Sequence, residues 1–98
     1  MASVLSEAEV DVALVERGLG WVQSDGMLVK VTRHGDFGGA LAYVNQVGAL
    51  AEEVDHHPDI DIRWDTVTLY LVNHSAGGIT PKDLSLAATI DGLDQHPA

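Results

Sequence analysis

The stretch that decides the fold is AEEVDHHPDIDIRWDTVTLYLVNH, residues 51–74. It opens on the polar end of a helical pattern and then reaches Pro58. Apolar and polar residues alternate over 60–64, which is typical of a half-buried strand. Residues 66–73 are rich in β-branched and apolar types, which predicts a second strand. The stretch therefore predicts the end of a helix followed by a β-hairpin that turns near Asp65.

Upstream of this stretch, apolar residues recur at spacings of three and four and predict a long helix over residues 36–54. The residues of this stripe are Phe37, Leu41, Val44, Val47, Ala51 and Val54. Asp36 is the expected N-cap, because its carboxylate can accept a hydrogen bond from the first turn. The helix is expected to end near Asp55, because a proline disfavours helical geometry in the residue before it.

Two further patterns lie closer to the N-terminus. Ser6 is followed three residues later by Glu9, which is a capping box and predicts a first helix over 6–17. Asp25-Gly26 separates two strand-like runs and predicts a hairpin over 21–33. Both central residues of such a tight turn need positive φ, which aspartate and glycine tolerate.

The C-terminal part predicts one more helix. Thr80 is suited to the N-cap and Pro81 to the first helical position, and Gly92 is expected to end the helix. Residues 94–98 are expected to form a frayed tail. The element order α-β-β-α-β-β-α predicts an α+β fold with a four-stranded antiparallel sheet and helices packed on one face. We expect a single domain over residues 1–98.

Composition excludes several classes of function. The chain has 98 residues, no cysteine, and a formal net charge of −10 from 15 acidic and 5 basic residues. The few cations argue against direct nucleic-acid binding and against binding to anionic membrane surfaces. Without cysteine, disulfides and thiolate zinc sites cannot form. No apolar run approaches a membrane span and no signal-peptide pattern is present, so a cytoplasmic location is expected.

Three of the five histidines bracket the deciding stretch: His56, His57 and His74. Metal binding by these three is disfavoured, because adjacent side chains in an extended chain point to opposite sides. The zinc-enzyme pattern of two histidines four apart on a helix is also missing. Imidazoles can exchange protons near neutral pH, and a pair held in different environments can divide into an acid and a base. The residues alone therefore favour a proton-transfer site without a metal or cofactor.

The other two histidines, His34 and His96, are expected to be structural or surface residues. The chain carries no serine or cysteine in a nucleophile signature and no glycine-rich phosphate loop. Acid–base chemistry is thus favoured over covalent and phosphate chemistry.

A longer motif surrounds these histidines. It reads Glu52-x-x-Asp55-His56-His57-Pro58, then Asn73-His74, then Gly77-Gly78-Ile79-Thr80-x-x-Asp83-Leu84-x-Leu86-Ala87, together with Gly20-Trp21 and Phe37. In spacing and context this motif resembles the pterin-4a-carbinolamine dehydratase family, over residues 19–90. Three positions depart from the common pattern of that family: Ile60, Trp64 and Asn73.

The resemblance implies a hydro-lyase that dehydrates 4a-hydroxytetrahydropterin to quinonoid dihydropterin, a step of pterin recycling that needs no metal or redox cofactor. It implies that His56, His57 and His74 are catalytic, without saying which is the acid and which the base. It implies substrate-binding roles for four residues: Asp55, Asn73, Ser75 and Asp83. Asp83 can orient a histidine, or it can be an acidic residue that favours the first turn of a helix. Glu52 can be no more than part of the polar face of its helix.

The resemblance also implies partners. Relatives are dimers or dimers of dimers, so a homodimer or homotetramer is expected, with a pterin as the small-molecule substrate. The alternative function is a non-catalytic pterin-binding or protein-partner module on the same fold, of the dimerisation or coactivator type.

Overall fold

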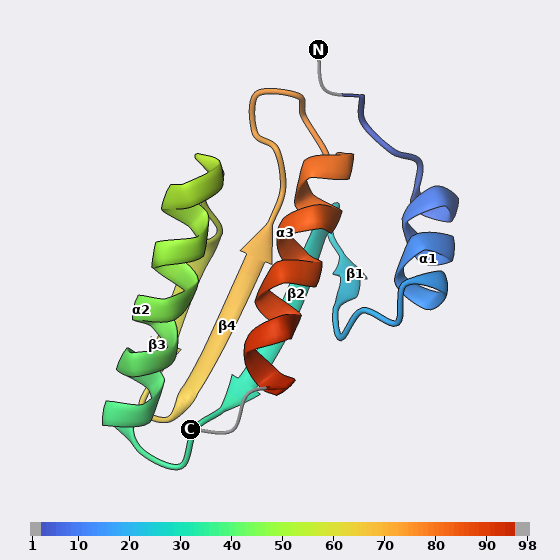
Figure 1. The fold of residues 1–98 in the computed structure, drawn as a ribbon. Helices are drawn as coiled ribbons and strands as arrows, with labels where there is room; N and C mark the ends of the chain where they lie inside the picture. Colours follow the sequence, from blue (N-terminus) through green and yellow to red (C-terminus); the bar gives the residue numbers. More distant parts are fainter. Residues whose placement is uncertain (1–2, 96–98) are drawn as a thin grey trace.

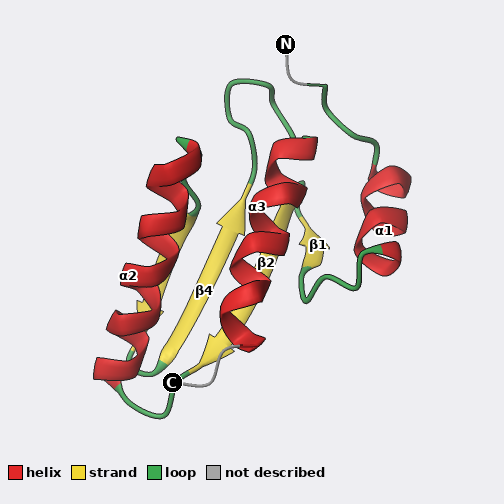
Figure 2. Ribbon diagram, viewed as in Figure 1, coloured by secondary structure: helices red, strands yellow, loops and turns green. Residues whose placement is uncertain are grey.

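The computed structural model describes residues 3–95. The elements are α1 (Glu7–Glu16), β1 (Val22–Ser24), β2 (Met27–Arg33), α2 (Phe37–Val54), β3 (Asp59–Arg63), β4 (Thr66–Leu71), α3 (Pro81–Asp91) and a 3-10 helix η1 (Gly92–Gln95). The predicted α+β fold is confirmed, with one antiparallel sheet and the helices on one of its faces (Figure 1, Figure 2). No helix within the described range is long and apolar enough to cross a membrane.

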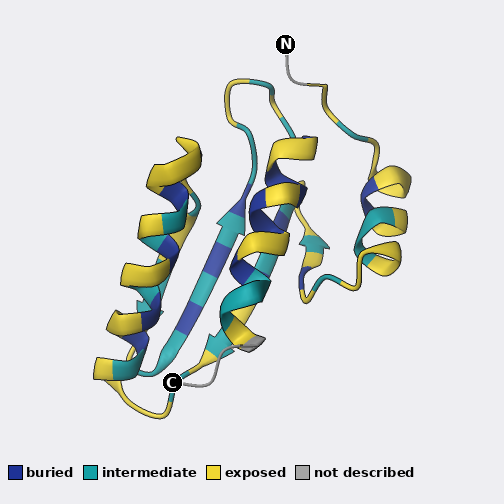
Figure 3. Ribbon diagram, in the orientation of Figure 1, coloured by how far each residue is buried: buried dark blue, intermediate teal, exposed yellow. Residues whose placement is uncertain are grey.

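The sheet has the order β1-β2-β4-β3, and all neighbouring strands are antiparallel. In the central pair, Leu28 lies opposite Leu71 and Lys30 lies opposite Leu69. These residues and Val67 are buried, because they face the helices. Figure 3 shows the same division, with the buried residues of α2 and α3 turned towards the sheet and the exposed ones turned away.

The local capping and turn signals of the sequence are confirmed. The hydroxyl of Ser6 accepts from the N–H of Glu9 at 3.1 Å, and the N–H of Ser6 donates to the Glu9 carboxylate at 2.8 Å. Asp25 and Gly26 both have positive φ, at 51° and 76°. The carboxylate of Asp36 accepts a backbone N–H in the first turn of α2 at 2.7 Å. Each of these signals acts within four residues, which is why the sequence shows it directly.

The predicted apolar stripe of α2 is confirmed in part, since Val47 and Ala51 are buried and Val44 packs against the core. Phe37, Leu41 and Val54 are 47%, 41% and 46% exposed. The buried residues of this helix are Ala40, Tyr43, Val47 and Ala51. The helix has apolar residues on more than one side, so spacings of three and four are compatible with either of two adjacent faces being buried. Packing against the sheet and α3 decides between them.

Trp64 was expected in the first strand of the second hairpin, and the structure corrects this. It lies in the turn between β3 and β4 with a φ of 52°, and it is 63% exposed. A two-residue hairpin turn commonly requires positive φ. Neither Trp64 nor Asp65 is a glycine, so the sequence pattern indicates the end of the strand only weakly.

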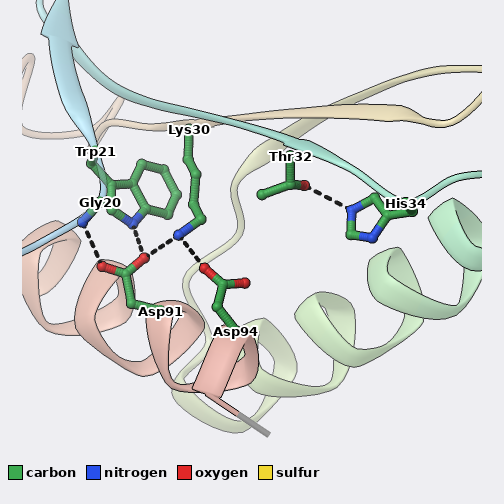
Figure 4. Close-up of polar contacts among 7 residues, drawn as sticks. All are labelled: Gly20, Trp21, Lys30, Thr32, His34, Asp91 and Asp94. Carbon is green, nitrogen blue, oxygen red and sulfur yellow. Dashed lines mark hydrogen bonds and ion pairs between the residues drawn. The ribbon is translucent and has the colours of Figure 1, made fainter. Parts of the chain in front are cut away.

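A buried cluster fixes the C-terminal end of α3 to the sheet (Figure 4). Nζ of Lys30, a residue only 7% exposed, lies 2.5 Å from Asp91 Oδ1 and 2.6 Å from Asp94 Oδ2. Asp91 also accepts from the N–H of Gly20 at 2.8 Å and from Nε1 of Trp21 at 2.9 Å. One carboxylate thereby connects α3, β2 and the segment that precedes β1.

The same cluster corrects the expected tail. Residues 94 and 95 belong to η1, and Asp94 is bound to Lys30 rather than frayed. A partner so distant in sequence cannot be seen in a local pattern. His96 and the two residues after it lie outside the described residues.

Lys30 and the neighbouring Tyr43 both have raised pKa values. Burial alone would lower the pKa of Lys30, but hydrogen bonds and negative charge from Asp91 and Asp94 outweigh it. Burial raises the pKa of Tyr43, and the charge of Asp94 raises it further. The Tyr43 hydroxyl is buried and forms no hydrogen bond with any described residue.

We expect stability to fall at alkaline pH. Both folded-state pKa values lie above their ordinary values of 10.5 and 10.0, so the folded chain retains protons that the unfolded chain releases. The free energy of unfolding should hold its full value below those ordinary values and decrease as pH rises through the folded-state values. Tyr43→Phe removes one of the two titrating groups and an unpaired buried hydroxyl. It should raise the free energy of unfolding by about 1 kcal/mol at pH 8 and weaken the alkaline decrease.

Urea unfolding followed by circular dichroism between pH 8 and pH values above the ordinary pKa of lysine measures both effects. Stability that increases over that range, or a Tyr43→Phe variant that is less stable at pH 8, would contradict this account.

Candidate active site

The corner after α2 separates the two adjacent histidines. Asp55 caps the helix in the left-handed conformation, with φ 51° and ψ 46°, so the expected helix end is confirmed. The N–H of His56 still donates to the carbonyl oxygen of Ala51 at 3.1 Å. Beyond this point the chain reverses. The side chain of His56 is only 11% exposed, whereas that of His57 is 54% exposed.

His56 is held by Asp83 from the first turn of α3. Its Nε2 contacts Oδ1 of Asp83, and the Asp83 side chain is fully buried. The other carboxylate oxygen accepts from the N–H of Thr80 at 2.8 Å and from its hydroxyl at 3.2 Å. A buried carboxylate is tolerated only when such donors surround it. Asp83 therefore serves the start of α3 and orients His56, so both roles considered for it from the sequence are present.

His57 points outward and meets Glu52. Its Nε2 lies 2.8 Å from Oε2 of Glu52, in a pair that is 54% and 76% exposed. The sequence pattern indicates only a position on the polar face of the helix for Glu52 and does not reveal this contact. The reversal at Asp55 is what brings the fifth residue after Glu52 back against the last turn of α2. Proline at position 58 indicated that reversal, but its direction depends on the left-handed cap.

His74 is carried by the loop after β4. Asn73 builds this loop, since its backbone forms a bridge with Gly78 and its side-chain oxygen accepts from the N–H of Ala76 at 2.9 Å. Nε2 of His74 lies 3.7 Å from Oδ2 of Asp59, the first residue of β3. Asp59 follows directly after Pro58, so all three predicted histidines lie at the end of the molecule where α2 and β4 end and α3 begins (Figure 1).

The remaining predicted site residues are found at the same end. Asp55 and Ser75 are exposed, and the carbonyl oxygen of Asp55 lies 3.4 Å from Nζ of Lys82. His34 lies at the opposite end of α2. There its Nε2 is 2.8 Å from Oγ1 of Thr32 (Figure 4). Its ring also packs on that of Tyr43. His34 is therefore remote from the other described histidines.

The three histidines share one arrangement. Each turns Nε2 towards a different carboxylate: Asp83, Glu52 or Asp59. For His56 and His57 we assign the proton of the neutral ring to Nε2, since a carboxylate can only accept, and Nδ1 is then the free acceptor. The 3.7 Å between His74 and Asp59 is too long for a hydrogen bond and determines no tautomer. Among residues 3–95, no three histidine or carboxylate side chains converge as metal ligands would. One fixed and two accessible imidazoles are suited to moving protons.

Comparison with known families gives a match over almost the whole chain. The model of the family described as pterin 4 alpha carbinolamine dehydratase matches residues 3–93. A protein of Mycobacterium sp. strain JLS, named as a candidate pterin-4-alpha-carbinolamine dehydratase, is 51% identical over 91 residues, which are 93% of this chain and 96% of that protein. A protein of the same name from Mycobacterium tuberculosis strain H37Ra is 44% identical with the same coverage.

Two solved structures share the fold. A transcriptional coactivator/pterin dehydratase from Brucella melitensis superposes with a TM-score of 0.83 at 30% identity, covering 93% of this chain and 98% of that one. A pterin dehydratase-like protein described as a RuBisCO assembly factor in the alpha-carboxysome has a TM-score of 0.64 at 25% identity, covering 83% and 96%.

Asp83→Asn should change the tautomer of His56. The amide has one acceptor oxygen, which the two donors of Thr80 require, so its NH₂ group must face Nε2 of His56. The ring must then carry its proton on Nδ1. Long-range ¹H–¹⁵N spectra of the neutral imidazoles should show His56 changing from the Nε2–H to the Nδ1–H form. The signals of His57 serve as an internal control, and an unchanged His56 tautomer in a folded variant would refute the contact.

Proposed function

Because the chain belongs to the pterin-4a-carbinolamine dehydratase family, we propose that it is a hydro-lyase that converts 4a-hydroxytetrahydropterin to quinonoid dihydropterin. The observation that carries this proposal is the pairing of two adjacent imidazoles with two carboxylates in different environments. His56 is held by the fully buried Asp83, and His57 is held by the exposed Glu52. We also propose a cytoplasmic location and a single domain, as expected from the sequence.

The reaction needs two proton movements and no change of oxidation state. The C–O bond at the tetrahedral carbon breaks, and the departing hydroxyl takes a proton and leaves as water. The adjacent ring nitrogen gives up a proton as the new double bond forms. The substrate thus loses the elements of water and nothing else. General acids and bases suffice for both steps, each contributing typically about 10²–10⁴ in rate.

We assign the proton transfers to the accessible rings. His57 and His74 have side chains 54% and 76% exposed, so a bound pterin can reach their Nδ1 atoms. His56 is mostly buried, and we propose that it forms the part of the site that stays fixed. Asp55, Asn73 and Ser75 are proposed to contact the pterin. The exposed carboxylate of Asp55 suits the N–H donors of an aminopyrimidinone ring, and Asn73 also holds the loop in shape.

The first experiment follows the decay of freshly generated 4a-hydroxytetrahydropterin by absorbance at neutral pH. We expect the protein to accelerate the decay and His57→Ala to lower that acceleration by at least about 10². His34→Ala is the matched control, because that ring lies at the other end of α2 and should leave the rate unchanged. A folded protein that does not accelerate the decay would refute the dehydratase proposal. Parent-level turnover in His57→Ala would refute the role of His57.

A second candidate function is a protein-partner module, and one observation favours it. The open face of the sheet carries Val22 and Val31, which are 61% and 60% exposed. The strand register places them on the same face as Val29 and Tyr70. The sequence showed no clear apolar stripe of this kind. Such a face is suited to self-association as a dimer or tetramer, and it is also suited to another protein.

Light scattering at micromolar concentration separates these states. We expect the mass of a dimer or tetramer, and Val31→Lys should shift the population towards the monomer because it places a charge in the apolar face. Lys82→Glu, at an exposed position in the first turn of α3 on the helical face, is a matched control and should leave the mass unchanged. A monomeric parent protein would contradict the proposed self-association.

A further inference from the structure

The segment before α1 lies against the loop that carries His74. The backbone N–H of Leu5 donates to the carbonyl oxygen of Ile79 at 2.8 Å. The side chain of Leu5 is partly buried and packs against the hydrophobic core. In Figure 1 the N-terminal segment and the connection from β4 to α3 lie at the same end of the molecule as the ends of α2 and β4. The described chain thus begins at the candidate active site.

The side chain of Val4 lies against Gly78. A Cβ atom built at Gly78 would lie 2.6 Å from Cγ1 of Val4, well inside van der Waals contact. A glycine at this position lets the N-terminal segment approach the loop backbone closely. On the inner side, the N–H groups of Gly77 and Gly78 donate to the carbonyl oxygen of Asn73 at 2.9 and 3.2 Å. The loop is therefore held by Asn73 within itself and by Val4 and Leu5 from outside.

The contact lies between two parts of the site. His74 precedes Gly78 by four residues, and Ile79 is followed by Thr80, whose N–H and hydroxyl bind the carboxylate that orients His56. A shift of residues 78 and 79 would therefore move His74 and the support of His56 together. The side chain of His74 is exposed and lies 3.7 Å from Asp59, so its position depends mainly on that of the loop backbone.

We propose that Val4 and Leu5 are positioning residues for the dehydration. They contact no reacting group and act through residues 78 and 79, and this inference rests on the proposed function. The contacts of residues 4 and 5 with residues 78 and 79 hold the loop that carries His74. Displacing a catalytic group by about 1 Å can cost on the order of 10² in rate, so a small movement of this loop is sufficient to matter.

The test is a four-protein cycle of the parent, Gly78→Ala, Val4→Ala and the double variant. Gly78→Ala should lower kcat about 10-fold with little change in KM, because the new methyl group displaces the loop. In the double variant, the remaining side-chain atom of residue 4 would lie 3.7 Å from the new Cβ, an ordinary contact. Its kcat should return to that of Val4→Ala, which we expect to lie about 3-fold below the parent because truncation of Val4 removes part of the contact that positions the loop.

Gly48→Ala is the matched control for a glycine-to-alanine change. A Cβ at Gly48 meets nothing within 4 Å, so its kcat should equal that of the parent. If Gly78→Ala does not yield folded protein, recovery of folded protein in the double variant would support the contact. A double variant as impaired as Gly78→Ala, or a Gly78→Ala variant with parent kcat, would overturn the proposal.

Amide hydrogen exchange gives a readout that does not depend on activity. The amides of residues 77 and 78 report on their bonds to Asn73. Their exchange should speed up about 10-fold in Gly78→Ala and slow again in the double variant. An inactive parent with this exchange pattern would refute the dehydratase proposal and retain the loop contact. Unchanged exchange in Gly78→Ala would refute the contact itself.

Discussion

The site depends on one buried carboxylate. Asp83 is fully enclosed, and an ionised group in that position is stable only when hydrogen-bond donors replace the lost water. Thr80 supplies two donors and His56 supplies the third. The positive end of the α3 dipole favours a negative charge at this point as well. Because the same carboxylate completes the first turn of α3 and contacts the chain after α2, the helix start and the histidine corner form one unit.

The three histidine–carboxylate pairs differ in how firmly they are held. The pair of His56 and Asp83 is buried, and breaking it would remove one of the three donors to a buried carboxylate. The pairs formed by His57 and His74 are exposed, and exposed pairs typically contribute less than about 1 kcal/mol even when both groups are charged. Those two rings can therefore exchange a carboxylate for a substrate at little cost. One buried histidine pair that stays in place and two exposed pairs that can open suit a site that holds one edge of a ligand still and moves protons at another.

Much of the fold could be predicted because its signals are local. The capping box at Ser6, the turn at Asp25-Gly26, and the caps at Asp36 and Thr80 each act within one turn of chain. Predictions failed where a distant partner decides the outcome. The buried side of α2 is set by the sheet beneath it, and Asp94 is ordered by Lys30, 64 residues earlier in the chain. The sequence patterns predict no strand order, because β2 and β4 pair across the whole of α2 and β3.

The candidate site contains, within five residues, both a feature that the sequence predicts and one that it does not. The motif singled out three histidines as catalytic, which stays a prediction, and the proline predicted a corner, which is confirmed. The motif does not predict that the two adjacent rings point in different directions. This difference follows from the left-handed conformation of Asp55. With the chain reversed at that residue, one ring turns towards α3 and the next turns back to α2. Two identical side chains, neighbours in the sequence, thereby meet a buried carboxylate and an exposed one. A backbone torsion at a non-glycine residue is thus what allows one His-His pair to provide two chemically different groups.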